Sequence, residues 1–168
     1  MAILVGSHVI ETDADKSKQI LEHGFGEQEE GSVTLSSVEA LYLVENKKLK
    51  VNEKGRVLSF EKLIGKFKQT DKDLDAKYFV YKDLRKKGYV ARTGLKYGTY
   101  FRVYEKGVRV GEGHSHWLVQ PIKEEWQTSI YEISKSIRLA HSVRKKIIWA
   151  VVDSEGDVTY YKFERIVP

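Results

Sequence analysis

The sequence predicts a mixed α/β (α+β) fold, with a small N-terminal α/β domain over residues 1–70 and a C-terminal domain over residues 71–168. Three observations lead to this expectation. Short strand-like runs lie between segments whose apolar residues recur every three to four positions, as they do in helices. Two Ser-x-x-Glu motifs mark helix starts. Residues 69–75 are polar and lack apolar periodicity, which places the domain boundary there.

In the N-terminal part, residues 2–5 and 8–10 predict short strands, and a short helix is expected from Asp15 to Gly24. Residues 26–32 are polar and predict a loop. The motif Ser36–Glu39 is a capping box, so a helix should follow it. A strand is then expected around Leu49 and Val51, with a turn over residues 52–55 and another helix from Ser59 to Phe67.

The C-terminal part should begin with a helix whose apolar residues lie between Ala76 and Leu84 and which stops at Gly88. Strands are expected over residues 89–91, 100–104 and 116–119, with turns at Gly94 and Gly98 and a strand end at Pro121. The remaining elements are a capped helix from Ser129 to about His141 with the apolar line Ile130, Ile133, Ile137 and Ala140, a central strand over 147–152 and a last strand over 158–163.

Composition limits the class of protein. Of 168 residues, 41% are hydrophobic, 32% are charged, two are proline and none is cysteine. A chain of this kind can bury a core without disulfides, and it is neither disordered nor collagen-like. It offers no thiolate nucleophile or cysteine-ligated metal site. Because no apolar run approaches membrane-spanning length and no secretory signal is present, we expect a soluble, cytoplasmic protein.

Positive charge is concentrated in the C-terminal part. Residues 1–70 hold 10 basic and 11 acidic side chains, whereas residues 71–168 hold 19 basic and 13 acidic ones, together with all three tryptophans and nine of the ten tyrosines. Cations among aromatic rings suit a nucleic-acid contact surface. A solvated basic face without a nucleic-acid partner explains the same composition equally well.

Several catalytic motifs are absent from the sequence, among them the nucleophile elbow, the phosphate-binding P-loop, the dinucleotide fingerprint and the zinc-binding His-Glu-x-x-His. Asp153, Glu155 and Asp157 alternate in a short turn, but a calcium loop would need a bidentate glutamate at its end. This acidic turn is therefore either solvated or fitted to a basic pocket. His114 and His116 would share one face of an extended segment, with no third metal ligand evident.

Three other residues together suggest cleavage of RNA without a metal. Tyr104 ends a strand, His114 precedes another, and Lys145 lies between a helix and the central strand. The 2′-hydroxyl can attack phosphorus when a base removes its proton, an acid protonates the leaving 5′-oxygen and a cation offsets the developing charge. Histidine suits the acid and lysine the cation, while tyrosine needs nearby cations such as Arg102 or Arg144 to act as the base.

Longer segments of the C-terminal part carry a resemblance to a known family. They are the runs 77–85, 88–90 and 93–98, the segment Phe101–Tyr104 with His114-Ser115 ten residues beyond, and the block Arg138–Lys146. These segments resemble the archaeal tRNA-splicing endonuclease (tRNA-intron endonuclease) family. Residues 35–43 carry a weaker resemblance in the N-terminal part.

The resemblance implies a nuclease-like catalytic C-terminal domain, with a mixed β-sheet and flanking helices, acting on the bulge-helix-bulge of precursor tRNA. It implies cleavage that needs no metal or other cofactor and leaves a 2′,3′-cyclic phosphate and a 5′-hydroxyl. The catalytic residues of the family would fall on Tyr104, His114 and Lys145, which excludes His116. No membrane partner is implied.

The resemblance also implies how RNA is held and how the chain assembles. Arg138 would clamp a bulge base by cation-π stacking, and Arg144 is a further RNA-binding candidate. The opposing arm of the clamp would fall near Tyr160 and Tyr161, where the chain has no arginine before Arg165. Family members of this length form homotetramers, in which the acidic turn, here Asp153, Glu155 and Asp157, enters a basic cleft of another subunit.

Two rival classes remain open at the level of sequence. A non-catalytic RNA-binding subunit of the same fold would be expected to lack part of the Tyr, His and Lys set, but this chain carries all three. A metal-dependent DNA nuclease would need carboxylates around the central strand, whereas residues 147–152 contain none.

Overall fold

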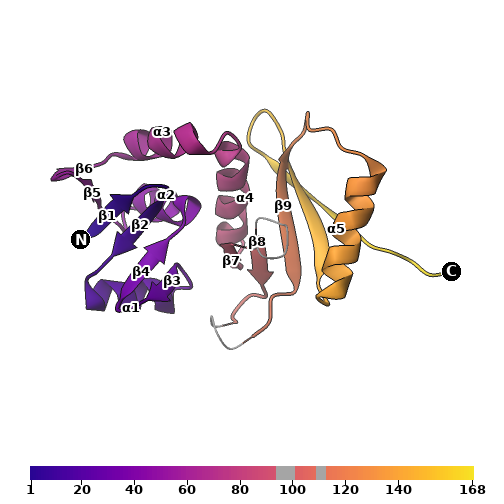
Figure 1. Ribbon diagram of the computed structural model, residues 1–168, viewed down its shortest axis with the longest axis horizontal. Helices are drawn as coiled ribbons and strands as arrows, with labels where there is room; N and C mark the ends of the chain where they lie inside the picture. Colours follow the sequence, from indigo (N-terminus) through magenta and orange to yellow (C-terminus); the bar gives the residue numbers. More distant parts are fainter. Residues whose placement is uncertain (94–100, 109–112) are drawn as a thin grey trace. The chain divides into compact units, whose positions relative to one another are not determined.

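The computed structural model describes residues 1–93, 101–108 and 113–168, and it confirms the mixed α/β class with two separate sheets (Figure 1). Contacts divide the chain into two compact units, Met1–Tyr78 and Phe79–Pro168. The boundary predicted near residue 70 lies between helices α3 (Phe60–Thr70) and α4 (Leu74–Lys86), and its position stays a prediction. No helix within the described residues is long and apolar enough to cross a membrane.

The N-terminal unit is a six-stranded sheet with helices α1, α2 and α3, and its strands follow the order β3-β4-β2-β1-β5-β6. All neighbouring strands are antiparallel except β1 and β5, which are parallel. The elements of this unit are β1 (Ala2–Val5), β2 (His8–Glu11), α1 (Ala14–Glu22), β3 (Glu27–Glu29), β4 (Ser32–Leu35), α2 (Ser37–Glu45), β5 (Val51–Glu53), β6 (Arg56–Val57) and α3.

Local motifs start the helices of this unit. The predicted capping box of α2 is confirmed, because the Glu39 carboxylate accepts hydrogen bonds from the Ser36 amide at 2.9 Å and the Ser36 hydroxyl at 2.7 Å. Its other oxygen accepts a bond from the amide of Gly26 at 2.8 Å, which ties α2 to the start of the β3–β4 hairpin. Residues 26–32, predicted as a loop, instead contain that hairpin, so this prediction was wrong.

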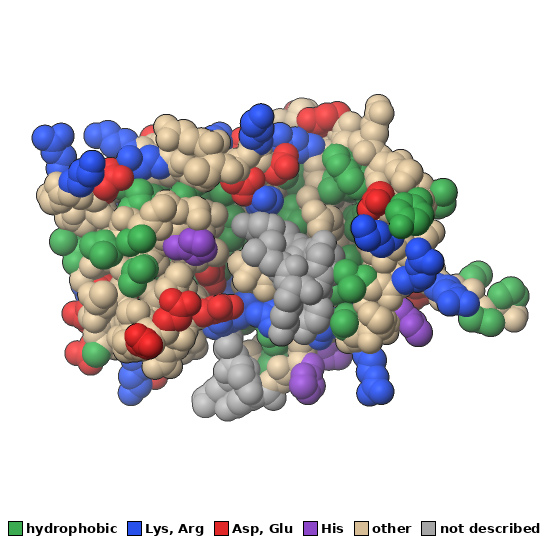
Figure 2. Space-filling view, in the orientation of Figure 1, with side chains coloured by type: hydrophobic (Ala, Val, Ile, Leu, Met, Phe, Trp, Pro, Cys, Tyr) green, Lys and Arg blue, Asp and Glu red, His purple; other side chains and the backbone are tan. Residues whose placement is uncertain are grey.

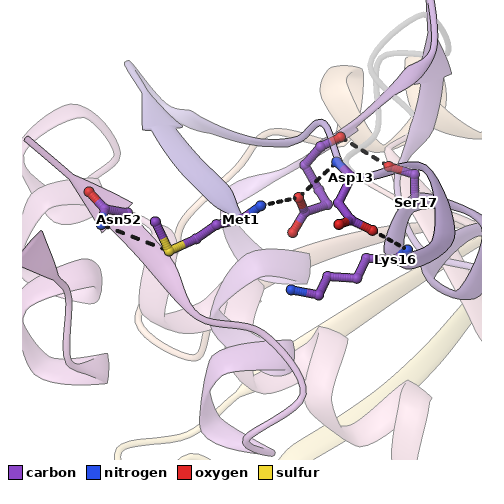
Figure 3. A network of polar contacts seen from close by, with 6 residues as sticks. Met1, Asp13, Lys16, Ser17 and Asn52 are labelled. Carbon is purple, nitrogen blue, oxygen red and sulfur yellow. Dashed lines mark hydrogen bonds and ion pairs between the residues drawn. The ribbon is translucent and has the colours of Figure 1, made fainter. Parts of the chain in front are cut away.

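A buried carboxylate connects β2 with α1 (Figure 3). Glu11 is 1% exposed, and its Oε1 atom lies 2.9 Å from the amino group of Met1 and accepts the amide of Asp13 at 3.1 Å. The Ser17 hydroxyl donates to the main-chain carbonyl of Glu11 at 3.0 Å. Asp13 caps α1 by accepting the amide of Lys16, a hydrogen bond that lowers the pKa of the Asp13 carboxyl.

The C-terminal unit is a five-stranded sheet with the strand order β11-β10-β9-β8-β7. Among the strands that the structure describes here, only β9 and β10 run parallel, and α5 connects them. The helix α4 begins before the division between the two units, and its Tyr81 packs on Phe101 of β8. The strands and the second helix are β7 (Val90–Thr93), β8 (Phe101–Tyr104), β9 (Trp117–Lys123), α5 (Ile130–Ser142), β10 (Lys146–Val152) and β11 (Val158–Phe163).

The two helices of this unit pack on opposite faces of the sheet. Ala140, Ile133 and Ile137 of α5 pack on a buried cluster formed by Leu118, Ile147 and Trp149. Phe101 lies on the other face, which α4 covers. It pairs with Val119, which directly follows Leu118 in β9. Successive side chains of a strand point to opposite faces, so Val119 and its partner Phe101 face away from α5. The alternation of side chains therefore shows, for each strand residue, whether its side chain lies on the face covered by α4 or on the face covered by α5.

Two further predictions for the C-terminal unit were wrong. The strand expected to stop before Pro121 continues to Lys123. Pro121 lies opposite Ala150 of β10, and the described residues of β8 pair with β9 no further than Val119, so the missing N–H removes no bond to that described part. Ile130, predicted on the apolar line of α5, is 77% exposed at the first position of the helix. The turns predicted at Gly94 and Gly98 lie outside the described residues.

Candidate active site at one end of the C-terminal sheet

The end of β8 and the beginnings of β9 and β10 are aligned across the C-terminal sheet. Val103 pairs with Trp117, and Trp117 pairs with Lys146. Because β8 runs antiparallel to β9 while β10 runs parallel to it, the end of β8 and the beginnings of β9 and β10 lie at the same edge. The residues next to this edge are Tyr104, the segment 114–116 and Lys145, so the topology brings all three predicted catalytic positions to one end of the sheet.

Hydrogen bonds extend this alignment beyond the strands. The amide of His116 donates to the carbonyl of Val103 at 3.0 Å, and the amide of Lys146 donates to the carbonyl of His116 at 3.0 Å. The Lys145 ammonium donates to the carbonyl of Ser115 at 2.7 Å. Lys145 is thus anchored on the residue that directly follows His114.

The side chains of the trio differ in exposure. Tyr104 is half-buried and lies opposite Val90 of β7, and His114 is exposed. Alternation places Tyr104 on the face that α5 covers, because Val103 shares the α4 face with Phe101. Lys145 lies in the turn directly before β10, and Lys146, the first paired residue of that strand, lies opposite Trp117 on the α4 face.

His116 has different surroundings from His114. A ring nitrogen of His116 lies 3.6 Å from a carboxylate oxygen of Glu105, and its ring packs beside Trp117 with centroids 5.7 Å apart. Its main-chain amide and carbonyl are both used in the alignment of the strands. The surroundings of His116 therefore suit a structural role at this edge.

The chain leaves α5 through an unusual turn that delivers Lys145. The amide of Lys145 donates to the carbonyl of Ala140 at 2.8 Å, and the amide of Arg144 donates to the carbonyl of His141 at 3.0 Å. This pair of bonds forms a Schellman motif, which calls for a left-handed residue that is usually glycine. Here that residue is Arg144, with φ of 55°. An arginine in this conformation is strained, and strain of this kind concentrates at functional sites.

Both RNA-binding candidates on the α5 side present their side chains to solvent. Arg138 lies on α5, one turn before its last residue, and is exposed, as is Arg144. Tyr104, Lys145, Arg138 and Arg144 are thus contributed by the same side of the unit or by the turn that ends its helix. The group has the composition expected of a site for a phosphate with an unpaired base beside it.

The two tyrosines considered for the opposing arm of a base clamp lie on opposite faces of β11. The Tyr160 hydroxyl donates to the Asp83 carboxylate of α4 at 2.6 Å, and burial together with this bond raises the pKa of Tyr160. Tyr161 pairs with Trp149 on the α5 face and is 51% exposed. Of the two, only Tyr161 has its ring on the side that carries Arg138.

The three carboxylates of the acidic turn have two different functions in the fold. Asp153 Oδ1 accepts the amides of Glu155 and Asp157, each at 2.9 Å, whereas the side chains of Glu155 and Asp157 are exposed. The turn also depends on Gly156, which has φ of 88° and whose position leaves no room for a Cβ beside the Phe79 ring. Asp153 therefore shapes the turn, and Glu155 and Asp157 are the charges it presents.

The described residues contain no group of three or more His, Asp or Glu side chains that could hold a metal ion. Sequence reasoning missed the role of Ser115, which is 6% exposed and supplies the carbonyl that anchors Lys145. It also missed the pairing of Trp117 with both flanking strands. Neither could be recognised from residue types, because both depend on the register of three strands.

Comparisons with known proteins cover both units. Residues 74–160 match the family described as the tRNA intron endonuclease catalytic C-terminal domain, and residues 1–64 match its N-terminal domain. The chain is 44% identical over 162 residues to the tRNA-splicing endonuclease of Thermococcus gammatolerans, covering 96% of this chain and 95% of that protein. Identity is 40% over 164 residues with the Pyrococcus abyssi protein of the same name, covering 97% and 94%, and 44% over 161 residues with that of Methanococcus vannielii, covering 95% and 90%.

Proposed function

The chain belongs to the tRNA-splicing endonuclease family, and from this membership we propose that it excises introns from precursor tRNA by cutting at bulge-helix-bulge motifs. It is an RNA-cleaving enzyme. The observation that carries the finer proposal is the convergence of Tyr104, His114 and Lys145 at one end of the C-terminal sheet.

The reaction we propose is an internal transesterification. Tyr104, as the phenolate, takes the proton of the 2′-hydroxyl at the cleavage site, and the 2′-oxygen attacks phosphorus. The bond from phosphorus to the 5′-oxygen breaks, and His114, as the imidazolium, gives its proton to that oxygen. The products are a 2′,3′-cyclic phosphate and a 5′-hydroxyl, with one proton taken up and one released by the enzyme and no water consumed.

Lys145 supplies the fixed positive charge in this scheme. The bond of its ammonium to the Ser115 carbonyl holds the charge beside His114, so the cation need not be reoriented as negative charge develops on the phosphorane. A carbonyl acceptor orients the ammonium without removing its positive charge, which stays available to phosphate oxygens. This arrangement supports a reaction that does not depend on a divalent metal.

RNA binding at the site is assigned to Arg138 and Arg144. An exposed guanidinium on α5 can stack on a base that the bulge leaves unpaired, without reading which base it is. In this proposal Arg144, which lies in the turn before Lys145, contacts the phosphate backbone. We assign the opposing arm of the clamp to Tyr161, because the Tyr160 hydroxyl is already bonded to Asp83.

The active enzyme is proposed to be a homotetramer held by the acidic turn. Glu155 and Asp157 are exposed beside each other in a turn that Asp153 makes rigid. Carboxylates presented in this way can enter a basic cleft of another subunit without further ordering of the backbone. We place this enzyme in the cytoplasm, where precursor tRNA would be its partner.

The test is cleavage of a bulge-helix-bulge RNA by the purified chain in EDTA. We expect the same rate in EDTA as in magnesium, 5′ ends that a kinase can label directly, and 3′ ends that resist phosphatase until acid opens the cyclic phosphate. A matched RNA with a single 2′-deoxy nucleotide at one of the two cleavage sites should remain uncut at that site. Cleavage at the 2′-deoxy site, or activity that requires magnesium, would refute the proposed chemistry.

A further inference from the structure

The N-terminal unit separates its charges into two segments. Residues 1–46 carry 2 basic and 9 acidic side chains, whereas residues 47–69 carry 8 basic and 2 acidic ones. Figure 2 shows Lys and Arg side chains gathered over the β5–β6 hairpin, with acidic side chains gathered near β3. The small net charge of this unit therefore conceals a strongly basic surface.

The basic segment folds around a groove. A hollow of about 710 Å³ lies between the β5–β6 hairpin and α3, and the charged side chains that line it are Lys54, Arg56, Lys62, Lys66, Glu53 and Glu61. Lys54 and Gly55, with φ of 49° and 81°, form the tight turn of the hairpin, and the Asn52 side chain accepts the amide of Gly55 at 2.9 Å. The hairpin is thereby fixed on one side of the groove, and α3 forms the other.

Most of the positive charge in this groove is not neutralised by the unit itself. Lys66 pairs with Glu53 at 2.9 Å. Lys54, Arg56 and Lys62 form no ion pair within the described parts of the chain, and all three are exposed. Glu61 is the remaining carboxylate on the lining. Three cations along a groove with one opposing charge form a surface complementary to a polyanion.

A glycine within α3 gives an independent indication of a ligand. Gly65 lines the groove in the middle of the helix, where glycine lowers helix stability relative to alanine. A Cβ built at this position would meet no atom within 4 Å, and its φ lies outside the left-handed range. Neither packing nor backbone conformation therefore explains the glycine. Close approach of a bound backbone to the helix does, because only glycine leaves that space empty.

We propose that the groove between the β5–β6 hairpin and α3 binds the phosphate backbone of RNA, in the part of the precursor that is not cleaved. That the bound RNA is precursor tRNA rests on the proposed function. Lys54, Arg56 and Lys62 contact phosphates, and the backbone passes close to the Cα of Gly65. The contacts are to phosphate and sugar, so they add affinity for RNA without specifying sequence.

The first test removes the three cations. Lys54→Ala, Arg56→Ala and Lys62→Ala in one chain should weaken binding of precursor tRNA on the order of 10-fold at moderate salt and reduce the slope of log affinity against log salt by about 2. The matched control is the triple variant Lys16→Ala, Lys18→Ala and Lys72→Ala, which makes the same charge change at exposed positions outside the groove. Equal effects of the two triple variants would overturn the proposal.

The second test uses Gly65→Ala, whose effects on stability and binding should be opposite. Alanine should raise the unfolding temperature, because the helix gains a better former and no clash arises. The same change should weaken RNA binding several-fold. A more stable variant with unchanged affinity would show that no backbone approaches Gly65.

Two further measurements separate this proposal from its alternatives. The single-turnover cleavage rate at saturating RNA should be equal in the groove variant and the parent, because the groove shares no residue with the candidate active site. Light scattering should show unchanged assembly. If the groove variant instead dissociates while its salt slope stays that of the parent, the groove binds the acidic turn of another copy and the proposal is wrong. If the parent fails to cleave RNA but the groove variant still lowers affinity and salt slope, the proposed function fails and the groove assignment stands.

Discussion

The Lys145 ammonium donates a 2.7 Å hydrogen bond to the main-chain carbonyl of Ser115, although the two residues are thirty positions apart in the sequence. The bond links the turn that ends α5 to the segment that precedes β9. It therefore holds a cation at the residue that directly follows His114. A carbonyl acceptor orients the ammonium without removing its charge.

Lys145→Ala should reduce the single-turnover cleavage rate by about 10² to 10³, because it removes a preorganised charge. The neighbouring Lys146→Ala is the control, since Lys146 is exposed and lies on the α4 face of the sheet. Rapid-quench kinetics at saturating RNA would measure both. Equal losses in the two variants would mean that only general positive charge at this edge matters.

His114→Ala should lower the single-turnover rate on the order of 10² to 10⁴ while RNA affinity changes little, as expected for loss of a general acid. His116→Ala should have the smaller effect on rate, because its ring packs against Trp117 and Glu105. Filter binding and rapid-quench kinetics separate the two properties. A larger rate loss in His116→Ala would show that the acid is assigned to the wrong histidine.

Arg138→Lys should slow cleavage of bulged RNA while the dependence of affinity on salt stays nearly constant. Lysine keeps the charge but loses the planar surface that stacks on a base, an interaction worth about 0.5 to 2 kcal/mol. Cleavage rates and salt titrations of binding give the two readouts. If Arg138→Lys matches the parent in both, this arginine contacts only phosphate or solvent.

Arg144→Gly should move stability and function in opposite directions. Glycine adopts the left-handed conformation of residue 144 without strain, so the C-terminal unit should be stabilised by up to about 1 kcal/mol. RNA binding should weaken, and its salt slope should fall by about 1, because one phosphate contact is lost. Thermal unfolding and salt titration test the pair of effects. A loss of stability would show that the Arg144 side chain supports the fold.

The acidic turn should respond differently to changes at its two kinds of carboxylate. Glu155→Ser with Asp157→Ser should convert the proposed tetramer into dimers in light scattering, with the folded unit intact. Asp153→Ser should instead destabilise the C-terminal unit by about 1 to 3 kcal/mol, because two main-chain amides lose their acceptor. A tetramer that survives the double substitution would mean that the acidic turn is only solvated.

Elements with local signals were predicted well from sequence. The capping box at Ser36 and the N-cap residues Ser59 and Ser129 start their helices as expected, and the strand over residues 158–163 has the predicted bounds. The β3–β4 hairpin was missed because β3 is polar throughout and exists through its pairing with β4, which in turn pairs with β2. β9 continues through Pro121 in the parallel pairing with β10, which is a property of the sheet.

The candidate site shows the same division. The residue types at 104, 114 and 145 suggested the chemistry, but only the register of β8, β9 and β10 brings their positions together. The end of α5 at Arg144 could not be predicted, because arginine gives no sequence signal for a left-handed residue. The basic groove was missed because charge was summed over residues 1–70, where an acidic segment cancels a basic one.

The parallel pairing of β9 with β10 has a consequence for when activity can arise. Tyr104 ends β8 and His114 lies shortly before β9, the next described strand along the chain, whereas Lys145 reaches them only after the crossover through α5 has closed. Parallel pairs of this kind form late, because the chain must first give up the entropy of a long loop. In the proposed mechanism, a nascent or heat-loosened molecule with β10 detached would hold the acid and base without the cation. RNA cleavage would then be suppressed whenever β10 and its core residues Ile147 and Trp149 are detached, so a partly folded molecule would not damage RNA.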